Sequence, residues 1–182
     1  MQDDLLAQPV DCIVNPANGF LRHGAGLAKL IARGAAPSEP AGSLDARQTP
    51  VLTDAAKAWW REQHVPTIAT GDVHVTSAGA LPFKGIIHAV GPVWKDGSLC
   101  EKALLASAHD NALAAAAERG WKSIAFPAIS CGLFRFPVEI AAPIALKSAQ
   151  GFRDQFETIT FALFEDSHFA AWRRAAVRVC AA

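Results

Sequence analysis

Two polar segments of the sequence combine residue types that can hold an anionic ligand. The first, NPANGFLRHGAGLAKLI, spans residues 15–31 and follows the apolar run VDCIV. Asn15 and Asn18 carry amide groups that both donate and accept hydrogen bonds. The glycines of HGAG precede a helix-like stretch, where backbone N–H groups and the positive end of the helix dipole favour a phosphate. The alternative is an ordinary strand-to-helix turn that the two asparagines cap.

The second segment, PAISCGLFRFP, spans residues 127–137 and has the same design. Ser130, Cys131 and Gly132 can present another row of backbone donors, and Phe134 can close over a sugar. Two such turns at two strand ends predict one cleft, suited to a diphosphate that bridges two sugars. In the alternatives, Phe134 is a core residue and Cys131 a small filler. Cys131 as a nucleophile is a third option, although no sequence signature supplies its histidine base.

Two further residues can read a base. Asp4 can accept a hydrogen bond from an exocyclic amine, and Phe164 can stack on a ring. An acidic N-terminus is usually solvated and a phenylalanine at a strand end often belongs to the core, so both alternatives stay open. The first segment matches neither the GxGxxG dinucleotide fingerprint nor the Walker loop, which argues against those nucleotide-binding classes.

Composition excludes several other classes of site. Seventeen basic and seventeen acidic side chains cancel, which leaves no electrostatic footprint for nucleic acid or an anionic membrane. Cys12, Cys100, Cys131 and Cys180 have no CxxC spacing, so we expect no zinc site and no disulfide framework. We also expect no cofactor. The start MQDDLLAQPVD lacks the pattern of a secretory signal, and no run reaches roughly 18 apolar residues. We therefore expect a cytoplasmic protein.

Short apolar strands alternate with longer helical patterns along the chain. Strands are predicted at 10–15, 71–77, 85–90, 123–129 and 158–164. Helices are predicted at 26–34, 53–64, 99–119, 138–151 and 167–179. This alternation predicts an α/β fold with a mixed, largely parallel sheet that is covered on both faces. Residues 34–50 are rich in proline and are interpreted as a long loop, so we expect one domain over 1–182.

Taken together, these segments resemble the macrodomain family, whose members bind ADP-ribose. VDCIVNPAN is similar to the strand that enters the family's double-asparagine motif, and HGAGLA to its first phosphate loop. GDVHVTSAGALPFKGIIHAVGP is similar to the long family signature, and SIAFPAISCGLF to the second phosphate loop. The resemblance covers nearly the whole chain and implies a three-layer α/β/α fold. Only three residues precede Asp4, so the strand that the family usually has there is either lost or trimmed away.

The resemblance implies a role for each matching residue. Asp4, with Leu5 beside it, matches the adenine-reading aspartate, and Phe164 matches the adenine-side stack. Asn18 matches the asparagine that bonds the distal ribose, His23 lies at the rim of the first loop, and Phe134 matches the aromatic against that ribose. These last three are the predicted catalytic residues. The predicted ligand-binding set is Asp4, Leu5, Asn15, Asn18, Gly24, Ala25, Gly26, Leu27, Ala28, Ser130, Cys131, Gly132, Leu133, Phe134 and Phe164.

The implied activity is hydrolysis of mono-ADP-ribose from modified protein side chains. Many hydrolytic macrodomains carry an aspartate where this chain has Ala28, whereas HGAGLA resembles a viral-type loop in which alanine coexists with hydrolysis. Without a protein carboxylate, the substrate's own phosphate would have to hold the attacking water, which predicts a slow enzyme.

Four alternative activities stay open. They are a reader that binds ADP-ribose without turnover, an O-acetyl-ADP-ribose deacetylase, an ADP-ribose 1''-phosphate phosphatase, and an unrelated cysteine hydrolase using Cys131. The expected partners are ADP-ribose and mono-ADP-ribosylated proteins. The expected oligomeric state is a monomer.

Overall fold

The computed structural model describes residues 4–21, 26–35 and 68–180 of the chain. Within these ranges a five-stranded sheet has the order β2-β3-β1-β4-β5. The strands are β1 (Cys12–Ala17), β2 (Val73–Thr76), β3 (Gly85–Val90), β4 (Ser123–Phe126) and β5 (Thr158–Phe161). β2 is antiparallel to β3 and the other pairs are parallel, so the mixed, largely parallel sheet is confirmed.

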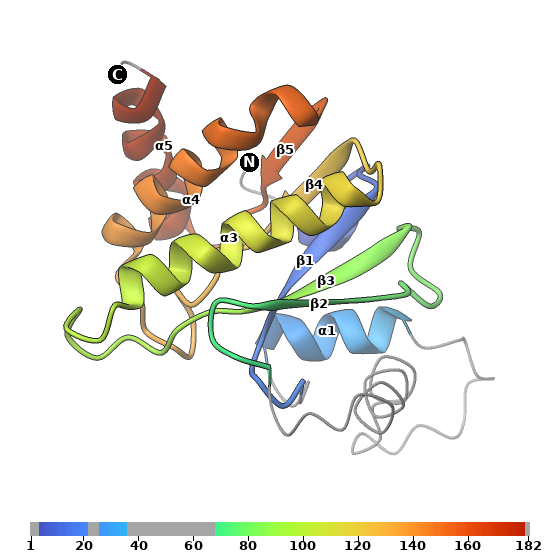
Figure 1. The fold of residues 1–182 in the computed structure, drawn as a ribbon, viewed down its shortest axis with the longest axis horizontal. Helices are drawn as coiled ribbons and strands as arrows, with labels where there is room; N and C mark the ends of the chain where they lie inside the picture. The colour runs from blue at the N-terminus through green and yellow to red at the C-terminus, as the bar shows by residue number, and fades with distance from the viewer. Residues whose placement is uncertain (1–3, 22–25, 36–67, 181–182) are drawn as a thin grey trace.

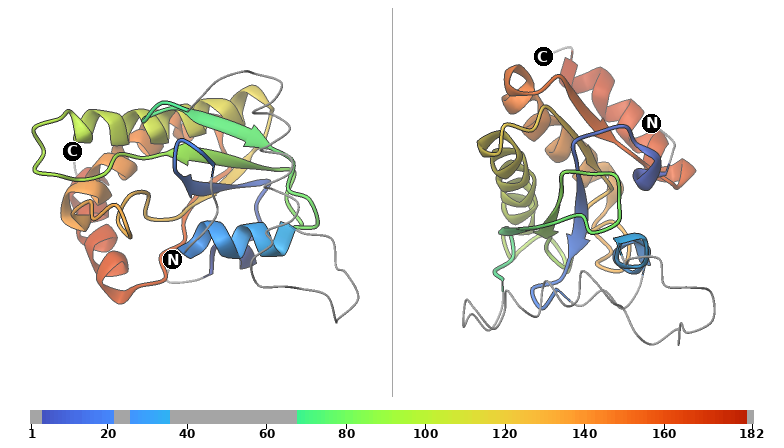
Figure 2. Two further views of the ribbon diagram at one scale, coloured as in Figure 1. Left: turned by 90° about the horizontal axis from the view of Figure 1, so that it is seen from below. Right: turned by 90° about the vertical axis from the view of Figure 1, so that its right-hand side faces the viewer.

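Helices cover both faces of this sheet (Figures 1 and 2). α1 (Gly26–Ala35) lies on one face, whereas α3 (Glu101–Glu118), α4 (Val138–Phe152) and α5 (Asp166–Cys180) lie on the other. Two short 3-10 helices, η1 (Leu5–Ala7) and η2 (Arg153–Gln155), precede β1 and β5. The three-layer α/β/α fold is therefore confirmed. The helix expected at 53–64 and most of the loop expected at 34–50 lie outside the described residues.

Alternating side chains along the strands contribute to two core clusters, one on each face of the sheet. Cys12 and Val14 of β1 belong to the larger cluster, which also holds residues of α3, α4 and α5. Ile13, between them, packs in the smaller cluster with Ile31 of α1. β3 is buried along its whole length and is correspondingly apolar, as central strands with two covered faces are.

Four of the five strands differ from the sequence prediction in at least one boundary, and proline explains one of these differences. β4 ends at Phe126 rather than at 129, because Pro127 follows and has no N–H to donate to a ladder. β1 starts at Cys12 and continues through Pro16 to Ala17. Pro16 is tolerated because β1 pairs with β4 only at Cys12 and Ile13, so this part of the strand has a neighbour on one side only.

His109 of α3 begins a row of rings that crosses the larger core. Its ring centroid lies 5.6 Å from that of Phe126, Phe126 lies 5.6 Å from Phe161, and Phe161 lies 6.1 Å from Trp172. The Nδ1–H of His109 donates to the carbonyl oxygen of Leu105 at 2.8 Å. Burial lowers the pKa of His109 to about 4, so this histidine is a neutral core residue at physiological pH.

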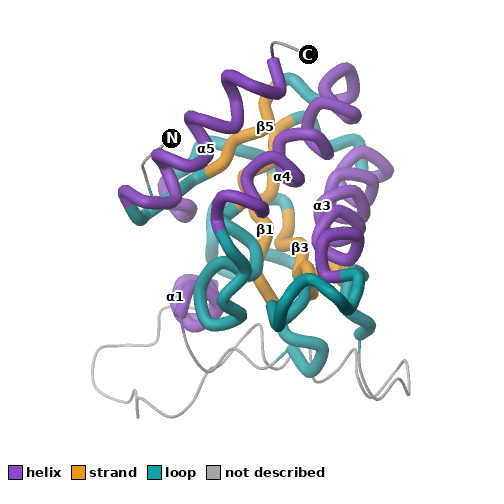
Figure 3. The backbone as a smooth tube through the Cα atoms, turned by 90° about the vertical axis from the view of Figure 1, so that its left-hand side faces the viewer, coloured by secondary structure: helices purple, strands orange, loops and turns teal. Residues whose placement is uncertain are grey.

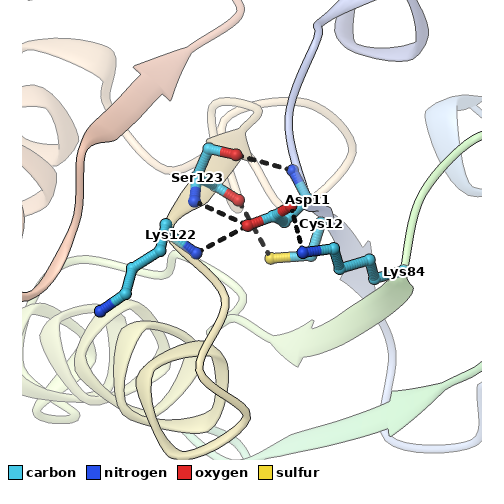
Figure 4. Close-up of polar contacts among 5 residues, drawn as sticks. All are labelled: Asp11, Cys12, Lys84, Lys122 and Ser123. Atoms are coloured by element: carbon cyan, nitrogen blue, oxygen red, sulfur yellow. Dashed lines mark hydrogen bonds and ion pairs between the residues drawn. The ribbon is translucent and has the colours of Figure 1, made fainter.

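Asp11, directly before β1, ties together the amino ends of the parallel strands (Figure 4). Its carboxylate accepts from the backbone N–H groups of Lys122 at 2.7 Å and Ser123 at 3.3 Å, and it pairs with Lys84 Nζ at 2.8 Å. These bonds, with the one from Lys84 the largest, lower the pKa of Asp11 against the opposing effect of partial burial. We call Asp11, Lys84, Lys122 and Ser123 the amino-edge cluster.

Candidate functional site

Four connecting segments lie beyond the carboxyl ends of the parallel strands. They are 18–21 after β1, 91–100 after β3, 127–137 after β4 and 162–165 after β5. Figure 3 shows the loops that lead into α3 and α4 side by side at this edge. Within the described ranges, every non-glycine residue with positive φ lies in these segments: Leu21, Cys100, Ser130 and Arg135. Such conformations cost energy and cluster at functional sites, so this carboxyl edge is the candidate site.

Asn15 is fully buried and begins a directed chain of hydrogen bonds across three strands. Its Nδ2 donates to His88 Nδ1 on β3 at 2.9 Å, and His88 Nε2 donates to Thr76 Oγ1 on β2 at 2.9 Å. Thr76 in turn donates to the carbonyl oxygen of Ser77 at 3.1 Å. Because the amide nitrogen can only donate, this order assigns His88 the neutral Nε2–H tautomer. Asn15 therefore anchors the strand end, and its contact with a ligand stays a prediction.

Asn18 shapes the turn that follows β1. Its Oδ1 accepts from the N–H of Phe20 at 3.0 Å, and its carbonyl oxygen accepts from the N–H of Leu21 at 2.9 Å. Gly19 has no room for a side chain, because a Cβ there would lie 2.6 Å from the carbonyl oxygen of Ile68. Asn18 thus closes a side-chain-capped turn, in addition to the ribose contact that we predict for it.

Gly26 opens α1 with a φ of +58°, and a Cβ at this position would meet no atom of the described residues within 4 Å. This open space lies at the N-terminus of a ten-residue helix, where backbone donors and the helix dipole favour an anion. Leu27 is half-buried and Ala28 is buried. His23, Gly24 and Ala25 lie outside the described residues, so their predicted roles stay predictions.

The loop after β4 turns its main chain toward solvent at Gly132, where a Cβ would meet nothing within 4 Å. Ser130 adopts a φ of +65°, and its hydroxyl is buried without a hydrogen-bond partner among the described residues. The turn is closed by two backbone bonds, from Arg135 N–H to Gly132 and from Phe136 N–H to Ser130. This loop therefore combines backbone strain, exposed main chain and an unsatisfied hydroxyl, a combination that suits a ligand site.

Apolar side chains border the two loops. Leu133 is 79% exposed and Phe164 is 86% exposed, whereas Phe134 is half-buried. A phenylalanine with both faces open to water offers its ring for stacking on a flat group. The exposure of Phe164 argues against the alternative that it is a core residue.

The N-terminal residues predicted to read adenine divide into one exposed and one buried side chain. Asp4 is exposed and caps η1, where its Oδ1 accepts from the N–H of Leu6 at 2.9 Å. Leu5 is only 3% exposed and shares the smaller core cluster with Ala162, the residue after β5. Membership of this cluster places the segment of Asp4 on the same face of the sheet as the residue after β5, which leads to Phe164.

Cys131 is not an activated nucleophile. Burial, with a smaller effect of the negative charge on Glu165, raises the pKa of its thiol to about 12. Its Sγ donates to the carbonyl oxygen of Ile129 at 3.5 Å. Because only the thiolate attacks, these surroundings argue against a cysteine hydrolase.

Metal sites and membrane spans are both absent from the placed part of the chain. It holds no group of three or more His, Cys, Asp or Glu side chains that could bind a metal ion. None of its helices is both long and apolar enough to cross a membrane. The cytoplasmic location and the monomeric state stay predictions.

His88 and Gly91 support this edge and were not predicted as site residues. His88 holds Asn15, as described above, and a Cβ on Gly91 would overlap the Ser130 hydroxyl and the Ile129 side chain. The sequence does carry a signal for each in IIHAVGP: a lone polar residue inside an apolar strand and a glycine directly after it. Such a glycine often marks the close approach of another part of the backbone.

Comparison with known proteins agrees with this geometry. The family model described as Macro domain matches residues 14–145. The chain is 37% identical over 177 residues to an O-acetyl-ADP-ribose deacetylase of Escherichia fergusonii, covering 96% of the chain and 92% of the relative. It is 38% identical over 167 residues to a macro domain-containing protein of Lactiplantibacillus plantarum, covering 90% and 86%. The chain therefore belongs to the macrodomain family.

Solved structures show the same fold. A point mutant of the Oceanobacillus iheyensis macrodomain, solved with ADPR, superposes with a TM-score of 0.84 and 28% identity, covering 98% of this chain and 91% of that one. The Trypanosoma brucei macrodomain in complex with ADP-ribose gives a TM-score of 0.75 at 22% identity, covering 96% and 67%. This second, more distant likeness supports the fold alone.

Proposed function

We propose that this macrodomain binds ADP-ribose at its carboxyl edge and hydrolyses the acetyl ester of O-acetyl-ADP-ribose. The observation that carries the proposal is the set of relatives named O-acetyl-ADP-ribose deacetylase, which are 34–37% identical over 94–96% of the chain. The Oceanobacillus iheyensis macrodomain, solved with ADPR and with ADP, supports the choice of ligand.

In this proposal the diphosphate lies between the start of α1 and the loop after β4. Gly26 opens a helix N-terminus where a Cβ would meet none of the described residues within 4 Å, and Gly132 exposes main chain in the loop after β4. Because the chain has no net charge, the phosphates must be held locally by such backbone donors. Asn18 and Phe134 would then face the distal ribose, and Asp4 and Phe164 the adenine.

The proposed reaction is attack of water on the acetyl carbonyl carbon. The bond between that carbon and the ribose oxygen breaks, a proton from the water ends on the ribose oxygen, and acetate and ADP-ribose leave. The Cys131 thiol stays protonated, which favours water over this cysteine as the nucleophile. Backbone N–H groups can stabilise the tetrahedral oxyanion, so acyl transfer tolerates the alanine at position 28 better than a reaction that requires a carboxylate there.

The sequence alone favours removal of mono-ADP-ribose from proteins as the first choice. The names of the relatives favour the deacetylase instead, and both reactions would use the same bound ADP-ribose. They differ in the group that water attacks and in whether a protein must approach the distal ribose. Substrate choice therefore separates them.

The test makes three measurements on the purified chain. They are release of acetate from O-acetyl-ADP-ribose, release of ADP-ribose from a protein modified on glutamate, and binding of free ADP-ribose by calorimetry. We expect binding and acetate release above a buffer control. Binding without either turnover would leave a reader module. Turnover of the modified protein alone would establish the mono-ADP-ribosyl hydrolase, and absence of binding would overturn the proposal.

Asn18→Ser tests the predicted role of the asparagine. Serine keeps an oxygen that can accept from the N–H of Phe20, so the turn is preserved while the amide donors are lost. If Asn18 acts on the reacting ester, acetate release should fall by more than ADP-ribose affinity does. Equal losses of both quantities would assign Asn18 to ground-state binding only.

A further inference from the structure

The loops after β3 and β4 contact each other although their strands are not neighbours. β1 lies between β3 and β4 in the sheet, so the two loops meet across the end of β1. The N–H of Trp94 donates to the carbonyl oxygen of Phe134 at 2.9 Å, and the Trp94 ring lies 4.7 Å from that of Phe136. Gly91 packs directly on Ser130, with no space for a side chain. The first loop therefore supports the second along its length.

One buried carboxylate organises the supporting loop. Glu101, the first residue of α3, is 2% exposed. Its Oε1 accepts from the N–H groups of Lys95 at 3.3 Å and Gly97 at 3.2 Å, and its Oε2 accepts from the N–H of Leu99 at 2.7 Å. Three backbone donors from five consecutive residues thus converge on a single side chain, which closes residues 95–99 into a compact loop.

The hydrogen bonds from residues 95–99 use both oxygens of Glu101 as acceptors, which favours the charged carboxylate. Desolvation raises the pKa of Glu101, but the backbone N–H groups of Glu101, Leu99, Lys95 and Gly97 together lower it below its usual value. The negative charge also lies in the first turn of α3, where the helix dipole favours it. A neutral amide at this position would replace one acceptor oxygen by a donor, and at least one backbone N–H would lose its partner.

We propose that Glu101 is a positioning residue for the loop at 130–136, acting through residues 95–99 and Trp94. It touches no reacting atom in this arrangement. The consequence for ADP-ribose rests on the proposed function, because the main chain at 130–134 binds the diphosphate only if that function is right. When the Glu101 carboxylate is lost, residues 95–99 loosen, the bond from Trp94 to Phe134 weakens, and the backbone donors of the second loop lose their fixed directions.

The test compares Glu101→Gln with Asp96→Asn. Asp96 lies in the same loop and accepts from the N–H and hydroxyl of Ser98, but it is exposed and bonds none of the donors that Glu101 holds. Amide hydrogen exchange follows residues 130–136, where the N–H groups of Cys131, Arg135 and Phe136 are bonded within the loop. We expect about tenfold faster exchange there and about tenfold weaker ADP-ribose binding in Glu101→Gln, with neither change in Asp96→Asn.

Faster exchange at 95–99 with unchanged exchange at 130–136 would overturn the proposal. If Glu101→Gln does not fold, Gly97→Ala strains the same loop, because Gly97 has a φ of +86° and its Cβ would lie 2.9 Å from the Trp94 ring. This variant should show the same pattern, and normal exchange at 130–136 in it would likewise overturn the proposal. If the wild-type chain fails to bind ADP-ribose, the proposed function fails, while exchange still decides whether Glu101 positions the second loop.

Discussion

At the amino edge of the sheet, the Asp11 carboxylate accepts two backbone N–H groups and pairs with Lys84. At the carboxyl edge, the Ser130 hydroxyl has no partner among the described residues, and four non-glycine residues adopt positive φ. Both edges belong to the same strands and share the same core. The amino edge thus satisfies its polar groups from within the protein, whereas the carboxyl edge leaves donors and rings open to solvent.

This difference indicates that one edge of the sheet contributes mainly to stability and the other mainly to ligand binding. A polar group that is already hydrogen-bonded within the protein has little capacity left to bind a ligand. An unsatisfied polar group or a strained turn lowers the stability of the free protein, and a bound ligand compensates for that loss. We therefore expect substitutions at the amino edge to change unfolding without changing affinity. Substitutions at the carboxyl edge should in addition change ADP-ribose affinity.

The largest expected effect is a loss of ADP-ribose affinity, measured by placing a glutamate at one glycine of each edge. Gly26 and Gly120 both have positive φ, +58° and +69°, and a Cβ at either would meet nothing within 4 Å. Gly26→Glu and Gly120→Glu should therefore carry similar strain, about 1–2 kcal/mol. Only the first brings a negative charge to the proposed diphosphate site, so ADP-ribose affinity should fall about a hundredfold or more. Calorimetry that gives equal affinities for the two variants would contradict the placement of the ligand.

Asp11→Asn should destabilise the fold by about 1–2 kcal/mol at pH 7, because charge-assisted hydrogen bonds are lost at a mostly buried side chain. The pKa of Asp11 is lowered in the folded state, so its contribution is present above the unfolded pKa and is lost as pH falls through the folded value. The difference between wild type and variant should thus shrink below about pH 4. Urea unfolding across pH measures this, with ADP-ribose affinity expected to stay constant.

Asp154→Asn is the matched control for that prediction. Asp154 pairs with Arg153 at 3.2 Å, but the two side chains are 92% and 74% exposed. Exposed pairs of this kind contribute little, so the change in unfolding should stay within about 0.5 kcal/mol. An equal loss in both variants would mean that the amino-edge cluster has no special role.

The smallest expected effect is that of Cys131→Ala. The thiol is held protonated by burial, and the loop uses its main chain rather than this side chain in the proposed site. Acetate release should stay within about twofold of wild type, since no bond to a reacting atom is removed. A collapse of turnover in a variant that melts normally would restore the cysteine as a nucleophile.

The elements of the fold were predictable because hydrophobic periodicity is a local signal. The run GIIHAV predicted the strand at 85–90 with its observed bounds, and the longest helical pattern gave α3 to within two residues at each end. Pro127 explains why the strand before it is shorter than its apolar composition suggested. Local chemistry also located the glycine-containing turn after β4, whereas most of the HGAG turn lies outside the described residues.

The residues that hold the site in place, such as Glu101 and His88, were not predictable in the same way. Glu101 bonds to main-chain N–H groups, which every residue but proline carries, so no residue type marks its partners. His88 meets Asn15 because β1 and β3 pair with these two residues opposite each other, a contact between positions 73 residues apart that neither strand's own sequence indicates. The side chain of Leu5 lies in the smaller core cluster, which the sequence did not indicate, and its contact with the ligand beside Asp4 stays a prediction.

Burial of the His109 ring next to Phe126 lowers its pKa, so we expect unfolding in mildly acidic solution to take up a proton at this position. In the unfolded chain a histidine binds a proton below about pH 6.5. In the folded chain burial lowers the pKa of His109, so it binds a proton only below about pH 4. Between these values each molecule that unfolds takes up a proton at this position, and stability decreases as the medium becomes more acidic. The full difference corresponds to about 3 kcal/mol, a large share of the stability of a domain of this size. We therefore expect mild acidity to destabilise this fold through a core residue rather than through the residues proposed to hold a ligand.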